Sequence, residues 1–416
     1  MIEINDKLTI TKRFLQEYNK KKSFTQTVLP MLIHNALVLP TLNSCLKTEL
    51  QKKILSSKTA FAFCELNEKF ASLPHSFWNS TATFDEKENY WILNGSKNRI
   101  FKDEYAQYLV FCRLNGKNTA EEAIGAFLLS NEEVSVYDDG SDNYGNQYLR
   151  INFENILVER PATLSGDNEI AALNVKAKGQ LAVAALIYGI IRQIFCNAIS
   201  RIQRNIKEAN TSLGVNQLEI HNLAHMSQML YSLESVLYHT TAHFDLYDNE
   251  KLDLYLQAMI CKILATEYST TILNELRLMF NSKELSDILS AETANVLNVL
   301  ASFLESSTSN RLLLAGKGLS SVGAWKFDHL IKLRLGSIYF WYFFKYKIFK
   351  QIKGEQRFDH SYDDLKNFKS ILNPALHKAA SQFKTVLQEL KFLSDQLLVK
   401  YGKVCDFVIL FCLFFA

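Results

Sequence analysis

The spacing of apolar residues along this 416-residue chain changes near residue 160. Between about 57 and 160, apolar and polar residues alternate and turn-forming residues are frequent, which is typical of β-strands. From about 161 to 320, apolar residues recur every three or four positions, which is typical of amphipathic helices. Three long segments there contain no proline: Leu181–Ile202, Leu213–His243 and Leu252–Phe280. The pattern predicts an α+β protein in which a small β-barrel or β-sandwich is followed by a helix bundle.

Composition excludes several classes of protein. The length allows two or three domains, and 48% hydrophobic with 21% charged residues is ordinary for a globular chain. A net charge of +3 without any Lys/Arg block gives no sign of nucleic-acid binding. The seven cysteines are scattered and form no C-x-x-C pair, so we expect buried, reduced thiols rather than a zinc site or disulfides.

The two ends of the chain carry no targeting signal that we recognise. The N-terminal residues are mixed and acidic, unlike a secretory signal or a transit peptide. The last nine residues, from Val408 to Ala416, are apolar but far fewer than the roughly 20 that span a bilayer.

Three strand-like runs define the expected β-domain. The first begins at Ala60 and reads A-F-A-F-C-E, the second, from Tyr90, reads Y-W-I-L-N-G-S-K, and the third, from Ile151, reads I-N-F-E-N-I-L-V. Asn94-Gly95 is the dipeptide that best supplies the positive φ angles of a tight turn, so we predict a hairpin turn there. Further strands are expected at Tyr108–Cys112, Ile124–Leu129 and Tyr148–Phe153.

These runs resemble the β-domain of the acyl-CoA dehydrogenases, where they read A-F-x-x-T-E-P, Y-x-L-N-G-x-K-x-W-I-T-N and V-x-F-E-N-x-x-V-P. The segment Leu46–Leu55 is similar to the T-x-E-Q-K-x-K-Y-L-P segment that precedes that domain. Past residue 320, N-P-A-L from Asn373 and the segment 383–402 resemble the extra helical domain of the very-long-chain branch. That branch includes a mitochondrial complex I assembly factor.

The resemblance implies the acyl-CoA dehydrogenase fold in four parts. They are a partial N-terminal helical domain (1–56), a central β-barrel domain (57–160), a four-helix bundle (161–320) and a truncated C-terminal helical extension (321–416). It also implies an FAD cofactor, an acyl-CoA substrate, an electron-transferring flavoprotein as electron acceptor, and a homodimer.

The resemblance places the catalytic base at Leu304. The family uses a glutamate in an F-E-G-T motif, and alignment on A-G-K-G-L from Ala315 puts that glutamate at Leu304 with Glu305 beside it. A one-residue gap would make Glu305 the base, but on a helix such a shift turns a side chain by about 100°. The R-D pair upstream of the motif is replaced by Asn295-Val296. Both alternatives stay open, and a solvated Glu305 fits the flanking residues better.

The positions that contact flavin in the family are also substituted. The T-E-P-x-x-G-S-D loop becomes the segment that starts Cys64-Glu65, and W-I-T-N retains Ile100 between Arg99 and Phe101. The glycines of G-G-x-G become Phe280-Asn281-Ser282-Lys283. An arginine that binds the pyrophosphate becomes Asn205, with Arg204 adjacent, and the arginine of S-G-R-F becomes Gln180. The candidate cofactor-binding residues are Cys64, Glu65, Arg99, Ile100, Phe101 and Arg204.

No other motif indicates a metal or nucleotide site. His221/His225 and His239/His243 have the spacing of metal ligands on a helix, but neither pair has the glutamate of H-E-x-x-H or an evident third ligand. We interpret them as packed or surface histidines and expect no metal. No G-x-G-x-x-G or P-loop sequence is present.

An aromatic run between Ile338 and Phe344 is followed by lysines. Rings at headgroup depth with ammonium groups reaching phosphates would suit a membrane surface, and a buried core helix uses similar runs. The resemblance to the very-long-chain branch points to the mitochondrial inner membrane. The candidate membrane residues are Trp341, Lys345, Lys347 and Lys350.

Two functional hypotheses follow. In the first, the chain has lost catalysis and flavin binding and acts by protein binding, such as complex I assembly on the matrix side of the mitochondrial inner membrane. In the second, it is an active FAD-dependent long-chain acyl-CoA dehydrogenase of fatty acid β-oxidation with Glu305 as base. The first is favoured, because the substitutions fall on positions that carry chemistry.

Overall fold

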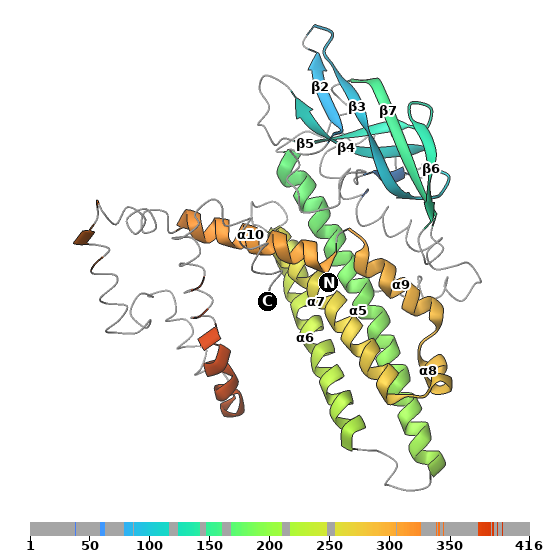
Figure 1. Ribbon diagram of the computed structural model, residues 1–416, viewed down its shortest axis with the longest axis vertical. Helices are drawn as coiled ribbons and strands as arrows, with labels where there is room; N and C mark the ends of the chain where they lie inside the picture. The colour runs from blue at the N-terminus through green and yellow to red at the C-terminus, as the bar shows by residue number, and fades with distance from the viewer. Residues whose placement is uncertain are drawn as a thin grey trace. The chain divides into compact units, whose positions relative to one another are not determined.

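The computed structural model describes residues 38, 59–62, 79–85, 87–115, 124–141, 147–159, 168–209, 217–247, 254–304, 306–325, 338, 340–341, 344, 373–383, 385–386, 389 and 393 (Figure 1). The chain divides into two compact units, Met1–Asn310 and Arg311–Ala416. The first unit contains a β-sheet and a helix bundle, and the second begins within a helix.

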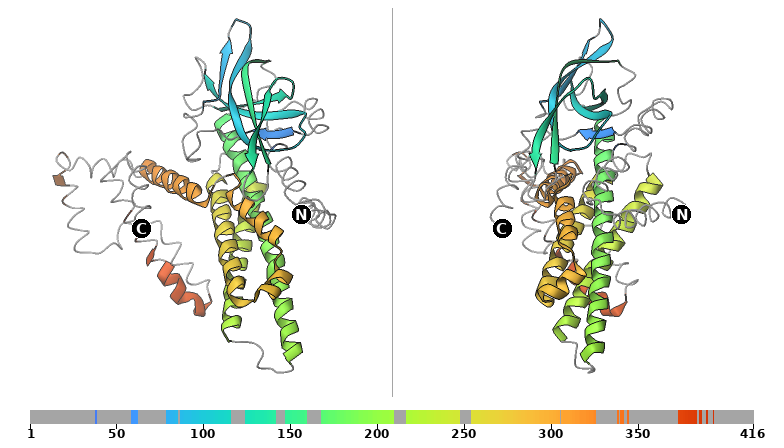
Figure 2. Two further views of the ribbon diagram at one scale, coloured as in Figure 1. Left: turned by 45° about the vertical axis from the view of Figure 1, so that its right-hand side comes forward. Right: turned by 90° about the vertical axis from the view of Figure 1, so that its right-hand side faces the viewer.

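Seven strands form one sheet in the described part of the first unit. The strand order is β1-β4-β2-β3-β7-β6, and β5 pairs with β4. β1 and β2 pair in parallel with successive parts of β4, while β5 runs antiparallel to it. The views in Figure 2 show the sheet curling over. The strands are β1 (Thr59–Ala62), β2 (Thr81–Asp85), β3 (Tyr90–Phe101), β4 (Gln107–Asn115), β5 (Ile124–Ser130), β6 (Ser135–Ser141) and β7 (Gln147–Glu159).

Strand β4 contributes to two hydrophobic cores. Tyr108 and Val110 lie in the core of the β-domain, whereas Leu109 and Phe111 lie in the core of the helix bundle. Successive side chains of a strand point to opposite faces, so one strand can serve both. β5 repeats the arrangement, with Phe127 in the sheet core and Ala126 in the bundle core.

The predicted hairpin turn at Asn94-Gly95 is wrong. β3 runs through both residues, and its register with β7 shifts between Leu93 and Gly95, which marks a β-bulge. Asn94 Oδ1 accepts a hydrogen bond from the Asn155 N–H at 2.7 Å across the bulge. The glycine is needed for close approach, because a Cβ on Gly95 would lie 2.6 Å from Ser80 Cα. The β2–β3 turn lies earlier, and its described residues 87–89 fall in the acidic segment.

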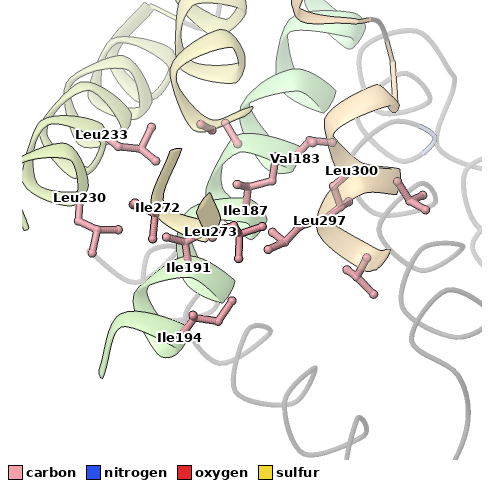
Figure 3. Packing of buried hydrophobic residues seen from close by; sticks show 14 of the residues in the cluster. Val183, Ile187, Ile191, Ile194, Leu230, Leu233, Ile272, Leu273, Leu297 and Leu300 are labelled. Atoms are coloured by element: carbon pink, nitrogen blue, oxygen red, sulfur yellow. The ribbon is translucent and has the colours of Figure 1, made fainter. Parts of the chain in front are cut away.

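Six helices follow the sheet in the described residues between 168 and 325. They are α5 (Asn168–Ala209), α6 (Gln217–Tyr247), α7 (Leu254–Met279), α8 (Ser282–Ile288), α9 (Ala291–Ser302) and α10 (Ser307–Trp325). The three long helices predicted from the apolar spacing are confirmed as α5, α6 and α7. α5 packs against α6, α7, α8 and α9. Its inward residues Val183, Ile187 and Ile191 face leucines and isoleucines of α6, α7 and α9 (Figure 3).

Residues Ala177–Lys207 of α5 are long and apolar enough to cross a bilayer by length and composition, which is weak support for a membrane span. The core helix of a soluble bundle has the same properties. The α5 residues named above are buried in the bundle core, and Arg192 is exposed midway along the helix.

Three cysteines fall among the described residues. Cys112 and Cys261 are buried free thiols, as expected, while the free thiol Cys196 is exposed, which corrects the expectation for that residue. Burial raises the pKa of the Cys261 thiol, whose S–H donates to Thr240 Oγ1 at 3.2 Å.

Few residues are described outside the sheet and bundle. Val38 is the one described residue before Thr59, and it is buried in the bundle core. In the second unit, Asn373 caps the short 3-10 turn Pro374–Leu376 by accepting from the Ala375 N–H at 3.1 Å. The other predictions for 1–56, and most of those for 321–416, lie outside the described residues.

Substitution of Gly95 tests the bulge. Gly95→Ala should lower the free energy of unfolding by about 3 kcal/mol, because the new methyl group forces the Ser80 backbone away. Gly140→Ala is the matched control, since Gly140 has φ +87° but open space around it, so it carries only the backbone strain of about 1–2 kcal/mol. Denaturant unfolding compares the two. An equal cost for both variants would contradict the close-approach explanation.

Candidate functional site at the junction of sheet and bundle

The linker 303–306 between α9 and α10 contains the expected position of the base. Leu304 has φ +64°, one of four positive φ values at described non-glycine residues. A bulky leucine in this region is strained, so its surroundings must hold it there. The side chain is half-buried and packs against the bundle core. It has no group that could accept a proton, and Glu305 lies outside the described residues.

Helix α7 holds both ends of this linker. Lys262 is only 1% exposed, and its Nζ donates a hydrogen bond to the Phe303 carbonyl oxygen. Ser307 Oγ donates to Glu267 Oε1 at 3.0 Å. These two hydrogen bonds attach the chain to α7 on both sides of Leu304.

Lys262 is not among the site residues predicted from the sequence. A signal was available, because Lys262 falls on the buried side of α7, with Ala258 four residues before it and Ala265 three residues after. A lysine at an inward position of an apolar helix requires an internal partner.

Phe101 joins the sheet to the linker. It is 8% exposed and belongs to the bundle core. Its ring centroid lies 5.0 Å from that of Tyr148 and 6.0 Å from that of Phe303. The position at which the resemblance implies a flavin-binding hydroxyl therefore carries a packed aromatic ring.

The neighbours of Phe101 face elsewhere. Ile100 is buried in the core of the β-domain. Arg99 is exposed, with φ +53°, and its backbone N–H donates to Asp139 Oδ2 at 3.1 Å. Of Arg99, Ile100 and Phe101, the structure brings only Phe101 to the linker. Cys64 and Glu65 lie outside the described residues.

The segment expected in place of G-G-x-G forms a helix cap. Phe280 is buried in the bundle core, and Asn281 caps α8 by accepting from the backbone N–H groups of Lys283 and Glu284. The Glu284 carboxylate accepts in return from the Asn281 N–H at 3.4 Å, which completes a capping box.

Glu284 also connects α8 to α5. Its Oε1 accepts from Asn205 Nδ2 at 3.0 Å and from Arg201 at 3.4 Å. Burial by itself raises the pKa of this carboxyl, but the hydrogen bonds from Asn205, Asn281 and Arg201 outweigh burial and lower it overall. A carboxylate held in its charged form beside Asn205 would repel an anionic pyrophosphate. The neighbouring Arg204 is exposed.

A buried amide pair links α5 to the start of α10. Gln180 Nε2 donates to Asn310 Oδ1 at 3.1 Å, and both residues are fully buried. Gln180 Oε1 and Asn310 Nδ2 have no hydrogen-bond partner. The resemblance aligns Gln180 with the arginine of S-G-R-F. In this structure its side chain instead connects α5 to α10.

The histidine pairs make contacts between helices. His225 Nδ1 lies 2.7 Å from Glu275 Oε1, and His243 Nδ1 lies 3.2 Å from Gln257 Oε1. Across the described parts of the chain, no group of three or more His, Cys, Asp or Glu side chains could hold a metal ion.

The aromatic run of the second unit is partly described. Trp341 is 79% exposed, and Phe340 and Phe344 are exposed beside it. The ring centroids of Phe340 and Phe344 are stacked 5.7 Å apart. Lys345, Lys347 and Lys350 lie outside the described residues.

Replacing the amide pair with leucine tests its role. Gln180→Leu alone should lower the free energy of unfolding by about 1–3 kcal/mol, because it leaves the Asn310 amide buried without any partner. The double variant Gln180→Leu/Asn310→Leu should cost less than the sum of the single variants, since it removes both buried amides. Denaturant unfolding of the three variants measures the coupling. Strictly additive losses would contradict the pairing.

Solved acyl-CoA dehydrogenase structures are similar to this chain. Butyryl-CoA dehydrogenase from Megasphaera elsdenii matches with a TM-score of 0.55 at 18% identity, over 68% of this chain and 75% of that chain. Glutaryl-CoA dehydrogenase from Mycobacterium smegmatis in complex with FADH2 matches with a TM-score of 0.55 at 18% identity, over 69% and 73%. Acyl-CoA dehydrogenase from Geobacillus kaustophilus matches with a TM-score of 0.54 at 16% identity, over 68% of this chain and 76% of that chain.

No protein-family model matches the chain, and no curated protein sequence matches it either. The structural matches establish that the chain has the acyl-CoA dehydrogenase fold, as the sequence predicted. Identities below 20% carry no information about activity, because one fold hosts many functions.

Proposed function

We propose that this acyl-CoA dehydrogenase-fold chain is a non-catalytic protein that has lost flavin binding and acts by binding other proteins. The observation that carries the proposal is the linker 303–306. Leu304 stands at the position expected for the base, and Phe101 packs on its neighbour Phe303. Removal of a proton from carbon needs a carboxylate or a similar base at this point, and a leucine cannot supply one.

The flavin positions support the same proposal. A flavin bound as in the family would need a hydrogen-bond donor at Phe101, open space at Phe280 and positive charge at Asn205. Phe101 and Phe280 are instead packed into the bundle core, and Asn205 is bonded to the Glu284 carboxylate. The described residues therefore do not fit FAD in that manner.

The partner is proposed from the sequence resemblance. The very-long-chain branch contains a complex I assembly factor, so we propose complex I assembly proteins on the matrix side of the mitochondrial inner membrane as binding partners. The exposed Trp341, Phe340 and Phe344 would suit contact with that membrane or with a protein on it.

Flavin binding distinguishes the two functional hypotheses. The purified full chain, mixed with FAD and separated from free cofactor, should show no visible flavin absorption. It should not oxidise a long-chain acyl-CoA with an artificial electron acceptor. An FAD-binding acyl-CoA dehydrogenase prepared in the same way is the positive control, and circular dichroism verifies that the chain is folded.

A flavin spectrum with acyl-CoA oxidation would contradict the proposal and support an active long-chain dehydrogenase. Glu305→Gln would then identify the base, because it keeps the size of the side chain and removes the carboxylate. Leu304→Met is its control. Loss of activity by about 100-fold or more in Glu305→Gln alone is expected of a general base.

The proposed partners are tested by affinity purification of the tagged full chain from solubilised mitochondria. Complex I assembly proteins should be enriched over a tagged active acyl-CoA dehydrogenase. The variant Trp341→Ser should reduce any enrichment that depends on the exposed aromatic residues. Equal recovery with both bait proteins would refute this choice of partner.

A further inference from the structure

Strand β6 forms one edge of the sheet. It comes last in the strand order, and no strand in the described part of the chain pairs with its outer side (Figure 1). Six of its seven residues are exposed, and Asp139 is half-buried. An edge strand presents backbone N–H and C=O groups along its outer side, and these groups can pair with a further strand.

The regular part of this edge is the segment Ser135–Asp138. Its four residues pair one by one with β7, and the register shifts only after them. Val136 is 40% exposed and Tyr137 is 50% exposed. As neighbours on a strand they lie on opposite faces of the sheet, so a strand added here would find an apolar side chain to contact on each face.

The devices that usually block an edge are absent from this segment or directed elsewhere. β6 contains no lysine and no proline, which are residues that natural proteins use to prevent edge pairing. Its two aspartates are bonded within the sheet domain. Asp138 Oδ2 accepts from Lys102 Nζ at 2.9 Å, and Asp139 Oδ2 accepts from the Arg99 N–H at 3.1 Å.

The charge along this edge is negative. Glu132 and Glu133 are exposed directly before the strand, and the segment 131–141 contains no lysine or arginine. Ion pairs with Lys102 and Arg150 offset the two aspartates of β6. The excess negative charge therefore comes from the two glutamates at the start of the strand.

We propose that the β6 edge binds an extended basic segment of another protein, which adds a strand to the sheet. In strand addition, main-chain hydrogen bonds give affinity and alternate side chains give specificity. Lysine or arginine in the segment would face Glu132 and Glu133, and its apolar side chains would contact Val136 and Tyr137. A second copy of this chain would bring its own acidic edge, and like charges across a strand pair are unfavourable.

The inference rests on the proposed function, because it names a surface through which a non-catalytic chain would bind other proteins. The two are tested by different measurements. A flavin spectrum with acyl-CoA oxidation would contradict the proposed function without affecting a measurement of strand pairing. A chain without flavin whose β6 edge binds no peptide would contradict this inference alone.

The test uses the full chain and a fluorescent peptide in which lysine and valine alternate, as long as a typical strand. Fluorescence anisotropy should show saturable binding. Hydrogen exchange should slow at alternate amides of Ser135–Asp138, because these become hydrogen-bonded to the peptide. The same peptide N-methylated at alternate residues keeps its charge and loses hydrogen-bond donors, so it should bind about 10-fold more weakly or less.

Two double variants place the binding site. Glu132→Lys/Tyr137→Lys should weaken peptide binding by about 10-fold or more, because lysines replace a negative charge and an apolar contact. Asp245→Lys/Tyr238→Lys makes the same two kinds of substitution at exposed positions of α6 and should bind the peptide as the wild type does. Circular dichroism verifies that both variants are folded.

Four outcomes would overturn the proposal. The lysine peptide could fail to bind, or bind without slowing exchange in β6. Both double variants could weaken binding equally, which would indicate general electrostatic attraction. Slow exchange of the β6 amides without peptide, at concentrations where the chain self-associates, would show that a second copy occupies the edge.

Discussion

The alternation of side chains along β4 and β5 is the constraint on which the rest of the structure depends. Leu109 and Phe111 on one face complete the core of the bundle, and Tyr108 and Val110 on the other complete the core of the sheet. A register slip of one residue would exchange these faces and expose both cores at once. Strands β4 and β5 are therefore shared between the two cores. Phe101 of β3 also lies in the bundle core, and its ring centroid is 6.0 Å from that of Phe303, so the linker 303–306 lies beside the sheet.

The fold was predictable from the sequence where the signal is local and repeats. Helices α5, α6 and α7 each present several turns of one apolar face, and strands such as β4 carry unbroken runs of apolar residues. β6 was not predicted, because its sequence Ser135–Ser141 is mostly polar and almost wholly exposed. A strand with no buried face shows no alternation of apolar and polar residues. Asn94-Gly95 was misassigned because the dipeptide signals local conformational freedom, and the contact with Ser80 that uses this freedom comes from another strand.

The candidate site was less predictable, because its geometry depends on pairs of residues far apart in the chain. Lys262 and Phe303 are brought together only when α7 packs against the linker. Gln180 and Asn310 are 130 residues apart and bond only after α5 meets α10. The sequence predicted Leu304 at the position of the base by alignment alone. It could not predict the left-handed backbone at this residue, which the bonds at both ends of the linker hold in place.

Several polar side chains near the linker and at α8 already have internal partners, and this affects any ligand that would need them. Lys262 donates to a backbone carbonyl, Asn205 and Arg201 donate to Glu284, and Gln180 donates to Asn310. A cofactor that needed these groups would have to break existing hydrogen bonds, each with a net value of about 0.5–1.5 kcal/mol, or more where a charge is involved. It would also have to displace Phe101 and Phe280 from a packed core, which costs several kcal/mol more on the scale of core rearrangements. Of the positions that the resemblance aligns with flavin-binding arginines, Gln180 is bonded to Asn310 and Asn205 to Glu284, so both side chains connect helices.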